Sequence, residues 1–72
     1  MTLDKYKMIA DTLAQEPDPA QATDQILHLR KHSGAKASVL TALLMVRLLD
    51  ANLKERAQTI IEELALAGGI AL

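Results

Sequence analysis

Apolar side chains recur every three or four positions in four stretches of the chain, a spacing typical of amphipathic α-helices. The predicted helices span about residues 3–15, 19–32, 36–50 and 53–67. Pro17 ends the first helix, because the residue before a proline is pushed out of the helical region of backbone space. Asp18 suits the N-cap of the second helix and Pro19 its first position. Gly34 is suited to end the second helix. We therefore expect an all-α fold of two antiparallel helical hairpins, forming a single domain over residues 1–72.

The third stretch is apolar almost all round, which indicates a helix that lies centrally in the fold or presents a face to a partner. The segment that follows it, Asp50-Ala51-Asn52, has two interpretations. It can be a tight turn in which Asn52 is the N-cap of the fourth helix. Alternatively, residues 36–67 form one long helix whose apolar spacing continues through Asp50. We favour the turn, because a charge at that apolar position is unfavourable in a coiled coil.

The composition supports helices and excludes several classes of protein. Half of the residues are hydrophobic, mostly Ala and Leu, and there is no Cys, so a disulfide scaffold and a Cys-ligated metal site are excluded. The longest strongly apolar stretch, residues 38–49, is interrupted by Arg47 and is too short to cross ~30 Å of hydrocarbon. The N-terminal segment lacks the continuous apolar run of a signal peptide. We expect a cytoplasmic protein without a membrane span.

An internal repeat appears when the chain is shifted against itself by about 35 residues. The identical pairs are Leu13 with Leu48, Ala22 with Ala57, Ile26 with Ile61, Leu29 with Leu64, and Gly34 with Gly69. These residues fall on positions expected to face inward and on the glycine that closes each hairpin. The pattern indicates a duplicated helical hairpin.

The period and this pattern resemble the tetratricopeptide (TPR) repeat, a helix–turn–helix unit. In the resemblance, Leu44 takes the large residue of the first helix, Ala22 and Ala57 the small residue of the second, and Ile26 and Ile61 the bulky residue one turn later. The chain departs from the family where Thr41, Met45 and Leu48 replace its Trp, Gly and Tyr, and no Pro closes either repeat. A generic pair of helical hairpins explains the same spacing.

The resemblance implies a groove lined by the first helix of each hairpin. Carried across, its residues are Asp4, Lys7, Asp11, Ala14, Val39, Ala42, Val46 and Leu49. It also implies a small adaptor or chaperone that holds a partner helix, similar in design to the short TPR-like chaperones of bacterial type III secretion.

Chain length also points to association, because one core of fewer than ~80 residues supplies only ~3–5 kcal/mol of stability. Apolar surface left exposed on a small protein is usually a binding face. The predicted partner-binding residues are Val39, Ala42, Val46, Arg47, Leu49, Ile70 and Leu72. Arg47 is expected to pair with Asp50, to pair with a carboxylate of a bound chain, or to extend to solvent at the rim. The partner is either another protein or a second copy, in which case the chain is a homo-oligomeric structural or regulatory protein.

Two polar clusters contain residue types that can carry chemistry. Asp24, His28 and His32 are spaced by four, which could align metal ligands on a helix, but a solvated polar face explains them better. The basic cluster Arg30, Lys31, His32 and Lys36 suggests a nucleic-acid-binding regulator, yet it lacks the stacking aromatics such proteins use. Nucleophile motifs and phosphate-binding loops are missing. We expect no enzymatic activity, no cofactor and no small-molecule substrate.

Overall fold

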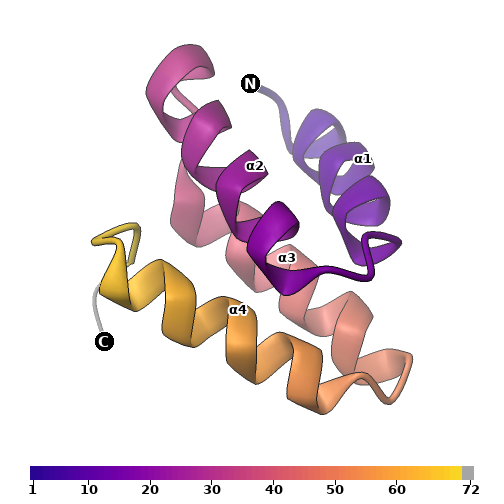
Figure 1. Ribbon diagram of the computed structural model, residues 1–72. Coiled ribbons are helices and arrows are strands. Elements are labelled where there is room, and N and C mark those ends of the chain that lie inside the picture. Colours follow the sequence, from indigo (N-terminus) through magenta and orange to yellow (C-terminus); the bar gives the residue numbers. More distant parts are fainter. Residues whose placement is uncertain (71–72) are drawn as a thin grey trace.

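The computed structural model describes residues 1–70, and these form four helices joined by short turns (Figure 1). The helices are α1 (Leu3–Ala14), α2 (Pro19–Ser33), α3 (Ala37–Asp50) and α4 (Lys54–Leu66). Each end lies within one residue of its predicted position, and no strand occurs in this part of the chain. The predicted all-α class is confirmed.

The starts of α1 and α2 are capped by side chains next to each helix. Thr2 Oγ1 accepts a hydrogen bond from the Lys5 backbone N–H at 3.2 Å, and Asp18 Oδ1 accepts one from Ala20 N–H at 3.0 Å. Gly34 ends α2 with a φ of 65°, a left-handed conformation that glycine adopts without steric cost. These local contacts explain why the ends of α1 and α2 follow from the sequence.

The chain turns between α3 and α4, so the prediction of a turn is confirmed and the single long helix is wrong. Asn52 has a φ of 59°, and the following Leu53 N–H donates to the Leu48 carbonyl at 2.8 Å. Asparagine tolerates this left-handed conformation better than most residues. The prediction that Asn52 is the N-cap of α4 is wrong, because Asn52 closes α3 and Leu53 occupies the N-cap position.

Helix α1 packs mainly against α3, and α2 packs mainly against α4, while α3 also contacts both α2 and α4. In Figure 1, α1 and α3 run in roughly the same direction, and so do α2 and α4. This arrangement is consistent with two successive helical hairpins laid side by side. Helices α1 and α2 contact each other much less, and a cleft stays open between them.

The core is built from aliphatic side chains of all four helices. Its largest fully buried members are Leu13, Ile26, Leu40, Leu44, Leu48, Ile60 and Leu64. Full burial of such a side chain contributes about 1.5–3 kcal/mol. Three of the seven come from α3, so α3 is the central helix of the fold.

Two polar contacts join elements that are distant in sequence. The Lys36 N–H donates to the hydroxyl of the buried Tyr6 at 2.8 Å, which links α1 to the start of α3. The hydroxyl of the buried Thr23 donates to Glu63 Oε2 at 3.1 Å, which links α2 to α4.

Candidate interaction surface

An apolar stripe runs along the solvent side of α3, the helix that supplies three of the seven largest fully buried side chains. We call Val39, Ala42, Val46 and Leu49 the α3 stripe; their spacing places them on one side of the helix. Val46 is 56% exposed and Leu49 is 53% exposed, while Ala42 is exposed and Val39 half-buried. The opposite side of α3 carries the buried leucines, so both faces of this helix are apolar.

An apolar groove lies beside the stripe, between α3 and α4. Its floor is formed by Met45 and Leu49 of α3 and by Ala57 and Ile61 of α4. We call this hollow of about 440 Å³ the α3–α4 groove. Because Leu49 belongs to both features, the stripe and the groove form one continuous apolar surface.

The polar rim of the α3–α4 groove comes from α4. Its members are Lys54, Gln58 and Glu62, all exposed. They are spaced by four residues, which aligns them along one side of the helix. The sequence does not reveal this groove, because Ala57 and Ile61 have the spacing of core residues and the hollow forms only where two helices meet.

Arg47 is held by its own chain. Its guanidinium pairs with the carboxylate of Asp11 on α1, and its Nη1 donates to the Leu43 carbonyl at 3.1 Å. Of the three alternatives for Arg47, pairing with Asp50 is wrong, because the guanidinium pairs with Asp11 instead. Surface ion pairs of this kind contribute at most about 1 kcal/mol, so the pair adds little to the stability of the fold.

Two of the predicted partner-binding residues, Ile70 and Leu72, are near the C-terminus. Ile70 is half-buried and packs against the core of its own chain, so it contributes less free surface than expected. Leu72 lies outside the residues that the structure describes. Of the groove positions implied on α1, Asp4, Lys7 and Asp11 are exposed.

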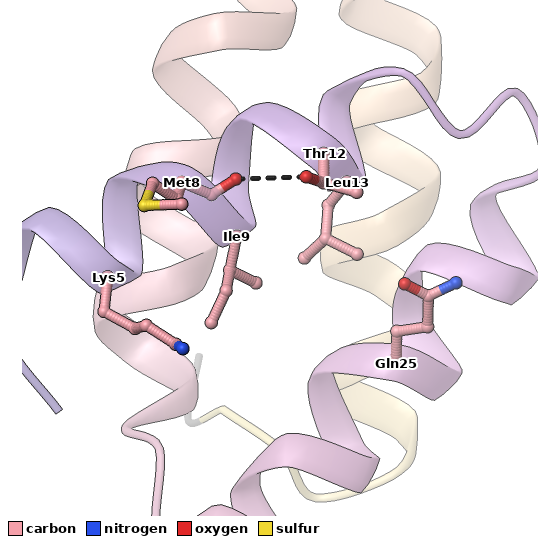
Figure 2. Close-up of a pocket in the computed structure, with 6 residues that line it drawn as sticks. All are labelled: Lys5, Met8, Ile9, Thr12, Leu13 and Gln25. Atoms are coloured by element: carbon pink, nitrogen blue, oxygen red, sulfur yellow. Dashed lines mark hydrogen bonds between the residues drawn. The ribbon is translucent and has the colours of Figure 1, made fainter.

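A second hollow of about 360 Å³ lies in the cleft between α1 and α2 (Figure 2). Ile9 and Leu13 project from α1 toward α2, and Gln25 faces them from α2. Met8, at its edge, is 66% exposed. The sequence did not indicate this cleft, because the distance between α1 and α2 depends on how each packs against its other neighbours.

The polar clusters are arranged as ordinary helix surface. His28 and His32 lie on one side of α2 with ring centroids 4.4 Å apart, and no group of three potential metal ligands forms anywhere in residues 1–70. Within the basic cluster, Arg30 Nη1 donates to the Gly68 carbonyl at 3.2 Å, so this side chain supports the end of α4.

In comparisons with known proteins, no family model, no curated protein and no solved structure matches this chain. Within the described part of the chain, no helix has the length and apolar character needed to cross a membrane.

Proposed function

We propose that this protein is a non-enzymatic protein-interaction module, and that the α3 stripe binds an amphipathic helix of another protein. The observation that carries the proposal is the exposure of Val46 and Leu49, both more than half accessible, on the central helix of the fold. Apolar side chains left in water gain about 25 cal/mol for each Å² that a partner covers.

The spacing of the stripe supports a helical partner. Val39, Ala42, Val46 and Leu49 repeat at intervals of three and four residues, the period at which one helix places apolar anchors against another. Ala42, in the middle of the stripe, is small enough for a partner backbone to approach closely. A module of this kind acts as a cytoplasmic adaptor or as a small TPR-like chaperone that keeps an apolar helix of its partner covered, including a partner destined for secretion.

Replacement of Val46 by aspartate tests the proposal, because it places a charge in the centre of the stripe. The matched control is Thr59→Asp, which adds the same charge at an exposed position in the middle of α4, outside the stripe and the groove. Circular dichroism first establishes that both variants are folded. The tagged wild-type protein is then used to capture a partner from the source cells, and the purified partner is titrated against all three proteins.

We expect Val46→Asp to weaken binding at least tenfold, since a charge desolvated without a partner is strongly unfavourable. Thr59→Asp should bind like the wild type. Equal binding by Val46→Asp and the wild type would show that the α3 stripe is not the binding face.

A further inference from the structure

The charges on the rim of the α3–α4 groove follow an ordered pattern. Along α4, Lys54 is positive, Gln58 is neutral and Glu62 is negative. The rise of a helix places the first and last of these residues about 12 Å apart along the axis, with Gln58 midway. Within residues 1–70, neither Lys54 nor Glu62 makes an ion pair or a side-chain hydrogen bond, so both charges are available to a second molecule.

This order of charges on one copy of α4 is complementary to the same order on a second, antiparallel copy. In a two-fold symmetric dimer every contact occurs twice. If residue i of one copy contacts residue j of the other, then residue j of the first copy contacts residue i of the second. Two α4 helices laid antiparallel with the axis at Gln58 place Lys54 of each copy opposite Glu62 of the other. A carboxamide is both donor and acceptor, so the two Gln58 side chains can hydrogen-bond to each other across the axis.

We infer that a second copy of this chain covers the α3–α4 groove, in a two-fold dimer paired through Lys54 and Glu62. The apolar floor, Met45, Leu49, Ala57 and Ile61, then lies between the copies, and the charged rim surrounds it. An apolar centre with a polar rim is the usual anatomy of a protein interface. A standard interface covers about 800 Å² on each partner, roughly a sixth of the 4562 Å² surface of this chain. Dimerisation also supplies stability that one small core lacks.

The dimer interface and the α3 stripe share Leu49, but their other contacts differ. Val46 does not line the groove, so substitutions on the α4 rim and at Val46 affect different contacts and test the two proposals separately.

Charge reversal tests the pairing by sedimentation velocity, at chain concentrations up to about 100 μM so that weak interfaces are included. Lys54→Glu and Glu62→Lys each create two like-charge contacts in a homodimer. We expect each single variant to dimerise about tenfold more weakly than the wild type. The double variant Lys54→Glu/Glu62→Lys restores both pairs in reversed order and should recover the dimer.

A mixture of the two single variants gives a sharper test. Lys54→Glu carries two acidic residues and Glu62→Lys two basic residues on the rim, so a heterodimer has two attractive pairs and should form about as well as the wild-type dimer. Lys31→Glu and Asp24→Lys have the same net charges but lie on the exposed surface of α2, and their mixture is the control for general charge attraction. We expect the control variants to keep the wild-type dimerisation constant, alone and mixed.

A monomeric wild-type chain over this concentration range would overturn the inference and leave the proposed function standing. A dimer that is insensitive to Lys54→Glu and Glu62→Lys, or whose single variants do not recover on mixing, would also overturn it. Val46→Asp separates the two proposals: it should weaken partner binding at least tenfold and leave the dimerisation constant unchanged.

Discussion

Replacing Thr41 by valine is expected to stabilise this protein. Thr41 lies in the middle of α3 and is only 5% exposed, and its Oγ1 has no hydrogen-bond partner among residues 1–70. A hydroxyl in a helix often bonds the carbonyl four residues earlier, as Thr59 does with Glu55 at 3.0 Å. Thr41 lacks this bond and has also lost its contact with water, so its hydroxyl is a net cost to the folded state.

The size of the effect follows from that unpaired group. Leaving a buried hydroxyl unsatisfied costs about 1–3 kcal/mol. Valine has nearly the same shape as threonine and a similar helix propensity, so neither packing nor the helix opposes the gain. The unfolded chain is also partly compact, which reduces the difference between the two states. We therefore expect the free energy of unfolding to rise by about 1 kcal/mol, which raises the melting temperature of a chain this small by roughly 4–8 °C.

Thermal and urea unfolding, followed by far-ultraviolet circular dichroism at one fixed chain concentration, measures the change. Two variants bracket the result. Thr59→Val removes an exposed hydroxyl and should stay within about 0.5 kcal/mol of the wild type. Thr41→Ser keeps the buried hydroxyl, loses a methyl group and should destabilise by about 1 kcal/mol. An unchanged or lower midpoint for Thr41→Val would refute the reasoning, because it would mean that the hydroxyl is satisfied in solution.

Two further predictions concern contacts that define the fold. Tyr6→Phe removes the oxygen that accepts from Lys36 N–H at 2.8 Å and should lower the free energy of unfolding by about 1 kcal/mol, measured by urea titration; no change would show that water replaces the hydroxyl. Gly34→Ala should cost about 1–2 kcal/mol in the same assay, because a φ of 65° is strained for alanine. A Cβ at Gly34 meets no atom within 4 Å, so the cost is conformational, and Gly34→Asn, which tolerates this φ, should cost less.

The helices could be predicted because their signals are local. Asp18 caps a free N–H group in the first turn of α2, and Pro19 has no N–H group that would need a partner there. Gly34 adopts the left-handed conformation at the residue where α2 ends. A cap or a break acts over three or four residues, so no knowledge of the rest of the fold is needed. The residues of the α3 stripe, Val46 and Leu49 among them, were named through the TPR resemblance, and the all-round apolar character of the third stretch pointed to the same helix.

Other features depend on how the helices pack. Arg47 pairs with Asp11, 36 residues earlier, and not with nearby Asp50, because the packing of α1 on α3 brings the two charges together. Ile60 is fully buried and Ile61 half-buried; adjacent residues point about 100° apart, and only the orientation of α4 decides which of them faces inward. The sequence by itself therefore determined where the helices lie and which faces are apolar. The tertiary structure decided which of those faces are covered, because burial depends on the positions of neighbours that local spacing does not encode.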